Sequence, residues 1–113
     1  MNNPELNLLV LRSADLEASV GFYGLLGFSF NEEKHERGPA HYSAEIGSLV
    51  LEIYPLGKRT PTADVRLGFA VDNLSEVIDM LDPESLVDAR QRENDMVVII
   101  KDPDGHTIEL TEL

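Results

Sequence analysis

Residues 96–113, MVVIIKDPDGHTIELTEL, decide the fold of this chain. The apolar, β-branched run Met96–Ile100 is typical of a strand that is buried on both faces. Lys101–Gly105 combines proline, aspartate and glycine, the residues that tight turns favour. His106–Glu112 then alternates between two sets of side chains, as a strand with one buried face does. The stretch therefore predicts a hairpin of two strands joined by a turn.

Glu109 lies in the middle of the second of these strands, between Ile108 and Leu110. The alternation places it on the same face as Thr107 and Thr111. One interpretation is a carboxylate on a solvated sheet face, which antiparallel sheets commonly have. The other is a carboxylate that lines a cavity. Both interpretations remain open from the sequence.

The composition limits the classes of function. The chain has 113 residues, enough for one domain with a core and too few for two ordinary ones. Its net charge of −12 argues against nucleic acid as a partner and is compatible with a cationic ligand, or with solubility alone. The absence of cysteine excludes disulfides, zinc–thiolate sites and thiol catalysis. Because no apolar run has membrane-spanning length and no signal peptide precedes the first strand, we expect a cytoplasmic protein without a membrane partner.

The rest of the chain alternates between strand-like and helix-like segments. Apolar residues at helical spacing, with capping residues before them, predict helices at 16–26 and 74–81. Further strands are expected at 6–11, from 28 onward, and at 40–46, 49–54, 65–71 and 85–90. The polar stretch 31–39 is expected to form a loop or the exposed end of a hairpin, and 55–63, with two prolines, a linker.

The two halves of the chain resemble each other. Leu11–Val20 and Phe69–Ile78 share the order strand, cap, helix, and Glu52 and Glu109 recur at nearly the same spacing. We therefore predict an α+β fold in a single domain, residues 1–113, built of two βαβββ modules at about 6–55 and 64–113. The modules would form a curved mixed sheet with a central cup and helices outside. Whether they pair within one chain or swap across a dimer stays open.

Two stretches resemble the signatures of a known family. Asp15–Phe28, DLEASVGFYGLLGF, resembles the first-helix signature of the vicinal oxygen chelate superfamily, which includes glyoxalase I, bleomycin resistance proteins and extradiol dioxygenases. Asp102–Leu110, DPDGHTIEL, resembles the terminal signature of that superfamily, D-P-D-G-x-x-I-E-L. Together with the repeat, the resemblance covers nearly the whole chain. It implies the fold and leaves the reaction open.

The resemblance also implies where a metal would bind. Metal-dependent members hold one divalent ion between four strands, and the ligand positions fall here on Leu8, Glu52, Arg66 and Glu109. The glutamates match the usual ligands. Leu8 has no donor atom, and Arg66 is a permanent cation that cannot ligate a metal. We therefore expect the four residues to line a ligand-binding cup that holds no cofactor, and the alternative is one divalent metal ion.

Arg66 has a role of its own in this expectation. We hypothesise that it replaces the metal as a counter-ion between Glu52 and Glu109, because a guanidinium can bond two carboxylates. The alternative is that Arg66 points to solvent. His41 is expected on a strand surface, with entry into the cup from the third strand as the alternative, and a metal enzyme would need it as an unorthodox ligand.

Three functions are compatible with this resemblance. The preferred one is binding of a small molecule in the cup without metal catalysis, as bleomycin resistance proteins do. The second is a divalent-metal-dependent lyase, isomerase or dioxygenase that uses Glu52 and Glu109, so whether the chain is an enzyme stays open. The third is an interaction module that keeps only the fold. We also expect a homodimer, because members that resemble this chain are commonly two-fold dimers and open sheet edges invite pairing.

Overall fold

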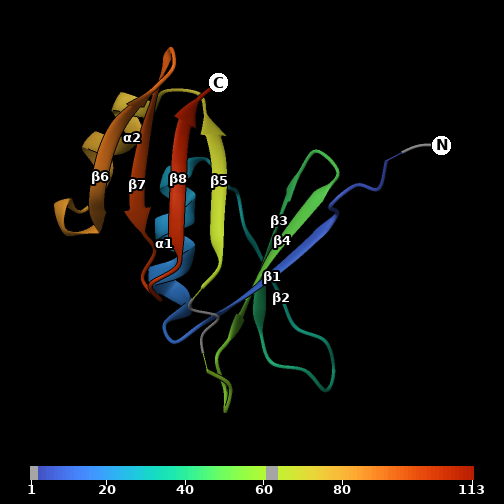
Figure 1. Ribbon diagram of the computed structural model, residues 1–113. Helices are drawn as coiled ribbons and strands as arrows, with labels where there is room; N and C mark the ends of the chain where they lie inside the picture. The colour runs from blue at the N-terminus through green and yellow to red at the C-terminus, as the bar shows by residue number, and fades with distance from the viewer. Residues whose placement is uncertain (1–2, 61–63) are drawn as a thin grey trace.

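The computed structural model describes residues 3–60 and 64–113. Figure 1 shows the order of the elements along the chain. They are β1 (Leu8–Ser13), α1 (Leu16–Leu26), β2 (Asn31–Glu33), β3 (His41–Ile46), β4 (Leu49–Pro55), β5 (Arg66–Val71), α2 (Leu74–Met80), the 3₁₀ helix η1 (Pro83–Ser85), β6 (Leu86–Arg92), β7 (Asp95–Lys101) and β8 (Thr107–Glu112).

The strands form two four-stranded mixed sheets, each built from one half of the chain. Their orders are β1-β4-β3-β2 and β5-β8-β7-β6, with β1–β4 and β5–β8 parallel and the other pairs antiparallel. The predicted α+β fold with two βαβββ modules is confirmed. Within the chain the two sheets are separate, and β1 and β5 are each an edge strand.

Capping residues place both helices where the sequence predicts them. The Asp15 side chain accepts a hydrogen bond of 3.2 Å from the Ala18 backbone N–H at the start of α1. Gly27 ends α1 with a φ of 117°, a left-handed conformation that glycine adopts without steric cost. Asn73 caps α2 in the same way, by accepting from Glu76. These local signals explain why both helix starts were predictable.

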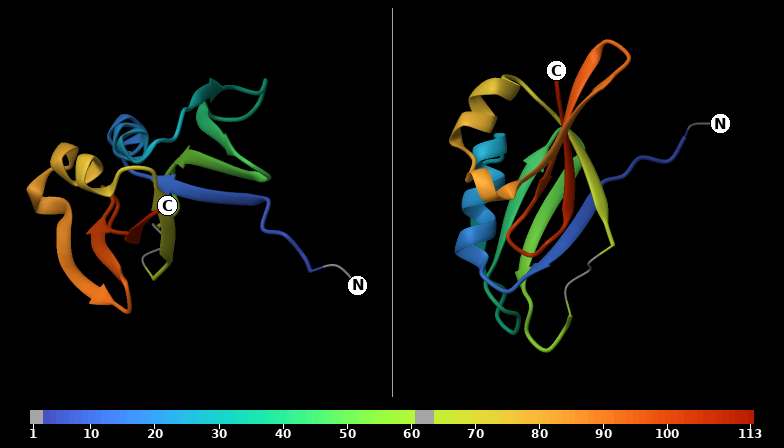
Figure 2. Two further views of the ribbon diagram at one scale, coloured as in Figure 1. Left: turned by 90° about the horizontal axis from the view of Figure 1, so that it is seen from above. Right: turned by 60° about the vertical axis from the view of Figure 1, so that its left-hand side comes forward.

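One hydrophobic core joins the two modules through their helices. The two helices lie on the same side of the molecule, beside the sheets (Figure 2). Buried side chains from both helices and both sheets form a single cluster, which comprises Leu11, Phe22, Tyr23, Leu26, Leu51, Ile53, Val71, Leu74, Val77, Leu81, Val98, Ile100, Ile108 and Leu110. The other face of each sheet is therefore turned away from this core.

The terminal hairpin forms as the sequence predicts. Val97 to Ile100 of β7 are all buried, and β8 alternates between buried Ile108 and Leu110 and the partly exposed residues beside them. Gly105 has a φ of 91° in the connecting turn, which only glycine adopts readily.

Two expectations about the first module were wrong. The second strand does not begin at Phe28 but spans Asn31–Glu33, so the expected loop or hairpin end at 31–39 begins with a short strand that pairs with β3. Phe28 instead packs edge-on against Phe69 of β5, with ring centroids 5.2 Å apart, so burial of its ring prevails over strand pairing. His41 is not a surface residue, because only 1% of it is exposed.

The expected linker at 55–63 is described only in part, since residues 61–63 lie outside the described residues. Across residues 3–60 and 64–113, no helix has the length and apolar character needed to cross a membrane.

Candidate functional site

The open face of the first sheet, meaning the side of β1–β4 away from the helices, carries two of the four predicted cup residues, Leu8 and Glu52. Strand alternation places Leu9, Leu11, Leu51 and Ile53 toward the core. The open face therefore holds Leu8, Val10 and Arg12 of β1, Val50, Glu52 and Tyr54 of β4, His41, Ser43 and Glu45 of β3, and Asn31 and Glu33 of β2.

Strand register brings four of these side chains into one row across the sheet. Glu33 pairs with His41, and Arg12 pairs with Tyr54. The His41 ring stacks on the Tyr54 ring, with centroids 4.1 Å apart and planes 6° from parallel. The Arg12 guanidinium lies 4.9 Å from the centre of the Tyr54 ring. The row thus fixes the orientation of the His41 imidazole.

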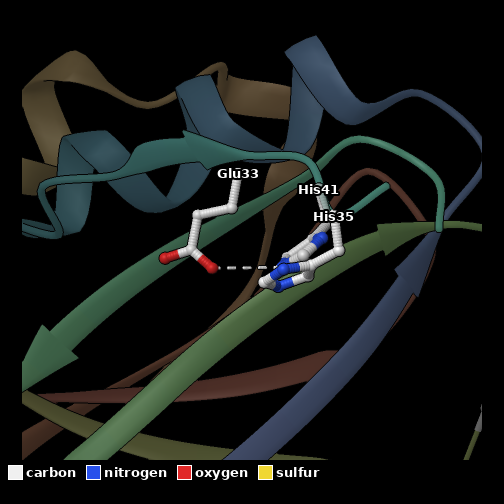
Figure 3. A group of neighbouring side chains, drawn as sticks. All are labelled: Glu33, His35 and His41. Carbon is white, nitrogen blue, oxygen red and sulfur yellow. Dashed lines mark ion pairs between the residues drawn. The ribbon is translucent and has the colours of Figure 1, made fainter. Parts of the chain in front are cut away.

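Two carboxylates flank the buried His41 ring. Its Nε2 atom lies 3.3 Å from Oε2 of Glu33 and 3.3 Å from Oε2 of Glu52. Glu52 itself is opposite Ser43 in the register of β3 and β4. Figure 3 shows Glu33 and His41 together with His35, which lies on the loop that follows β2.

A pocket of about 550 Å³ opens on this face of the sheet. It combines three carboxylates with two aliphatic side chains and a few small polar groups. Its lining is Asn7, Leu8, Glu33, Ser43, Glu45, Ser48, Val50 and Glu52. Such a mixture suits a ligand that has both an apolar part and a positive charge.

The second sheet presents a different arrangement around Glu109. Arg66 Nη1 lies 3.2 Å from Oε1 of Glu109, and Arg92 Nη2 lies 3.5 Å from the same oxygen. The Arg66 side chain is 63% exposed and that of Glu109 is 20% exposed. Glu109 therefore has two cationic partners at the surface of this sheet.

The four residues predicted for the cup occur as two pairs in separate sheets. Leu8 and Glu52 line the pocket of the first sheet. Arg66 and Glu109 form an ion pair in the second sheet. Over the described part of the chain, Arg66 forms no ion pair with Glu52, whose partner is His41. The counter-ion role hypothesised for Arg66 thus applies within this chain to Glu109 alone.

The side chains at the four superfamily ligand positions do not match the ligand set of the metal-dependent members. Leu8 offers no donor atom, and half of its surface is exposed on the edge strand β1. Arg66 already places a positive charge beside Glu109, where a metal would bind. No reaction step can therefore be assigned through a metal at Leu8, Glu52, Arg66 and Glu109.

A second hollow, of about 540 Å³, lies beside the helices. It is lined mainly by apolar side chains of α1, α2 and β5, including Leu25, Phe69 and Met80. Its carboxylate and amide groups come from Asp72, Asn73 and Glu76 around α2. It is lined by two carboxylates, whereas three line the open-face pocket, so the open-face pocket is the better candidate for recognition of a positively charged ligand.

The turn 102–106 has a structural role. Asp102 is buried and accepts hydrogen bonds from the Tyr23 hydroxyl and from the backbone N–H of His106. Burial, with the negative charge of Asp102 next to it, raises the pKa of Tyr23 far above its ordinary value. Asp104 accepts from the Ala14 backbone and the Ser19 hydroxyl. The turn therefore fastens the second module to the start of α1.

Sequence reasoning missed the group around His41. Glu33 was not chosen, because 31–39 was expected to be a loop or a hairpin end, and Ser43 and Glu45 were not chosen although they lie in the predicted strand 40–46. One signal was available, since His41, Ser43 and Glu45 alternate along one strand and must share a face. The neighbouring positions of Glu33 and Glu52 depend on cross-strand register, which the alternation alone does not give.

Comparison with known proteins supports the resemblance in the sequence. Residues 5–110 match the family model described as Glyoxalase/Bleomycin resistance protein/Dioxygenase superfamily. The chain belongs to this superfamily. No match was found among the curated proteins.

Solved structures of superfamily-like fold cover nearly all of the chain. An integron cassette protein from the mobile metagenome of V. cholerae is 21% identical, with a TM-score of 0.71 and coverage of 99% of this chain and 97% of that one. Oxidase ChaP-H2 is 16% identical, with a TM-score of 0.77 and coverage of 99% and 95%. TnmS3, an antibiotic binding protein from Streptomyces sp. CB03234, is 17% identical, with a TM-score of 0.73 and coverage of 99% and 98%. At these identities the likeness shows the fold alone.

Proposed function

We propose that this superfamily member binds a small organic cation in the pocket on the open face of the first sheet. The observation that carries the proposal is the lining of this pocket, where Glu33, Glu45 and Glu52 surround the aliphatic Leu8 and Val50. Three carboxylates in one shallow, open pocket attract a positive charge, and the net charge of −12 adds to the attraction. The aliphatic side chains provide apolar contact for the rest of the ligand.

The proposal includes binding without a metal at the superfamily's ligand position. An enzyme that used Glu52 and Glu109 together would need both carboxylates on one ion. In this chain the two glutamates belong to separate sheets and have separate partners, His41 and Arg66. The name of TnmS3, an antibiotic binding protein of similar fold, supports binding as a function that this fold can serve.

A second copy of the chain is part of the proposal. The helices and the core lie on one side of the sheets, so the open faces of both sheets are left uncovered within one chain. Leu8 and Val10 of the edge strand β1 are exposed apolar residues on the open face of the first sheet. Apposition of the first sheet of one copy with the second sheet of its partner would cover both, and we propose such a cytoplasmic homodimer.

The test is a thermal-shift screen of the full chain in the presence of EDTA. The probes are amphipathic organic cations, each paired with a neutral analogue of the same shape. A cation that binds only the folded state raises the unfolding midpoint, and its neutral analogue does so much less. Glu45→Gln should weaken the response of the unfolding midpoint to the cation. Glu45 lines the pocket and forms no ion pair within the described residues.

Glu17→Gln is the matched control, since Glu17 lies in the first turn of α1, away from the pocket. The control should keep the full response. Equal shifts for cations and neutral analogues, or an unchanged response in Glu45→Gln, would contradict a cation-binding pocket.

A further inference from the structure

We infer that Glu33, His35 and His41, none of which is one of the four superfamily ligand positions, form a binding site for a divalent metal ion of the zinc type beside Glu52. One ligand atom from each of the three residues lies within 4.8 Å of the others. The three side chains come from β2, from the loop after it and from β3 (Figure 3). Two imidazoles and one carboxylate are a ligand set that zinc and similar transition metals bind.

The strongest sign of a missing partner is the Nε2 atom of His41. Only 1% of the residue is exposed, yet Nε2 makes no hydrogen bond with any described part of the chain. Buried polar atoms almost always have a partner. Nε2 nevertheless points between two carboxylates, each 3.3 Å away. The atom therefore lacks a partner in a place where negative charge gathers.

The other ring nitrogen of His41 indicates which tautomer is present. Nδ1 lies 3.4 Å from the carbonyl oxygen of Pro39, and an N–H at Nδ1 donates toward that oxygen. This tautomer leaves the lone pair on Nε2. Metal-binding histidines commonly show this pattern, in which the remote N–H donates to a backbone carbonyl and fixes the ring.

The separation between ligand atoms also fits a metal ion. With metal–ligand bonds of about 2.0–2.1 Å, two ligands of a tetrahedral ion lie about 3.3–3.4 Å apart. Nε2 of His41 and Oε2 of Glu33 are 3.3 Å apart and are not hydrogen-bonded to each other. His35 is exposed, so a rotation of its side chain closes the remaining distance to the ion.

The surroundings favour a divalent charge at this point. Glu52 lies on the other flank of Nε2 and adds a second carboxylate to that of Glu33. Two carboxylates beside an imidazole lone pair repel one another, and a divalent cation between them removes the repulsion. The competing explanation is a proton on Nε2, which would make His41 an imidazolium.

The experiment is a titration of the metal-free full chain with Zn²⁺ and with Co²⁺, followed by calorimetry and by visible absorption of the cobalt form. Wild type should bind one ion per chain, with the absorption bands of low-coordinate cobalt. Glu33→Gln and His35→Ala should each weaken binding about tenfold or more. Both residues are partly or fully exposed, so neither variant depends on a buried substitution for folding.

Two control variants make the result specific. Glu36→Gln removes a carboxylate from the same loop without touching the cluster, and should leave the affinity within about twofold of wild type. Glu109→Gln removes a ligand of the superfamily position and should also have no effect. Absence of saturable binding at micromolar metal would overturn the site. Loss of binding in Glu109→Gln but not in Glu33→Gln would place the ion at the superfamily position instead.

The metal-site inference and the cation-binding proposal are tested by different experiments, so either one can be refuted while the other stands. The ligand screen runs in EDTA and depends on Glu45, whereas the metal site depends on His35, which does not line the pocket.

Discussion

The hydroxyl of Tyr23 donates a hydrogen bond of 2.6 Å to Oδ2 of Asp102, 79 residues later in the chain. The same oxygen lies 2.7 Å from Nδ1 of His106. All three residues are buried, so the bond links helix α1 of the first module to the terminal turn of the second. A buried carboxylate needs such donors, because a carboxylate without partners is costly inside a protein.

Tyr23→Phe should destabilise the fold by about 1–3 kcal/mol, because it removes one donor from the buried Asp102 and keeps the aromatic ring. Urea unfolding followed by circular dichroism measures the change. Tyr54→Phe is the control, since the Tyr54 hydroxyl has no hydrogen bond with a described residue. A loss in Tyr23→Phe no larger than in the control would show that the Tyr23–Asp102 bond contributes little.

The same tyrosine predicts the response to alkaline pH. Burial and the charge of Asp102 raise the pKa of Tyr23 in the folded state above its ordinary value near 10. A raised folded pKa means that the stabilisation is complete below the unfolded pKa and declines as pH rises toward the folded one. Above pH ~10 the free energy of unfolding should fall by about 1.4 kcal/mol per pH unit from this residue. In Tyr23→Phe, the fall in the free energy of unfolding with pH should be smaller by this amount. If the variant shows the same pH dependence as wild type, Tyr23 is not the buried, neutral group that this prediction requires.

At protein concentrations low enough to keep the chain monomeric, Arg66→Ala should change the free energy of unfolding by about 1 kcal/mol or less. The Arg66 side chain is 63% exposed, so water screens its ion pair, and Arg92 remains beside Glu109. Arg90→Ala is a matched control, because Arg90 is also more than half exposed and pairs with Asp88. Chemical denaturation measures the loss in the free energy of unfolding for each variant. A much larger loss in Arg66→Ala at these concentrations would contradict a screened ion pair between Arg66 and Glu109.

In the proposed dimer, the double substitution Leu8→His with Arg66→His should create a metal site that combines Glu52 of one copy with Glu109 of its partner. It supplies two imidazoles at the superfamily positions that lack donors. The background should be Glu33→Gln, so that the site around His41 does not contribute. Zn²⁺ titration of the correctly folded variant should show a new site, which Glu109→Gln should abolish. If no site appears, the two pairs of residues do not meet, either in one chain or across a dimer.

The protein should sediment as a dimer, at twice the monomer mass of 12.6 kDa. The physical reason is the uncovered open faces and the free edges of β1 and β5, which a second copy can cover. Sedimentation equilibrium at micromolar concentration measures the mass. Val10→Glu, which charges an exposed apolar position on β1, should shift the equilibrium toward the monomer. A single species of monomer mass in wild type would refute the dimer.

Much of the fold could be predicted because its signals are local. Asp15 and Asn73 cap the helices through contacts three residues away, and the turn at 101–105 depends on its own proline, aspartates and glycine. The alternation of apolar and polar residues along β8 is enough to place Glu109 on the face away from the core, because it does not depend on any other strand. The start of β2 was mispredicted because Phe28 contacts Phe69, a residue of the other module.

The candidate site was predictable only in part. Glu52 and Glu109 could be found from the repeat and from the resemblance. Glu33 could not, because its importance depends on its register opposite His41, and the sequence of a short polar strand does not specify register.

The sequence by itself determined the order of the elements, the helix caps, the two-module repeat and the superfamily, since each depends on neighbouring residues or on motifs of fixed spacing. Only the tertiary structure decided that His41 is buried between Glu33 and Glu52, and that Arg66 pairs with Glu109 and not with Glu52. The reason is that these contacts are set by strand register and by the packing of the two modules around shared helices. Both depend on residues far apart in the chain, which local patterns do not relate.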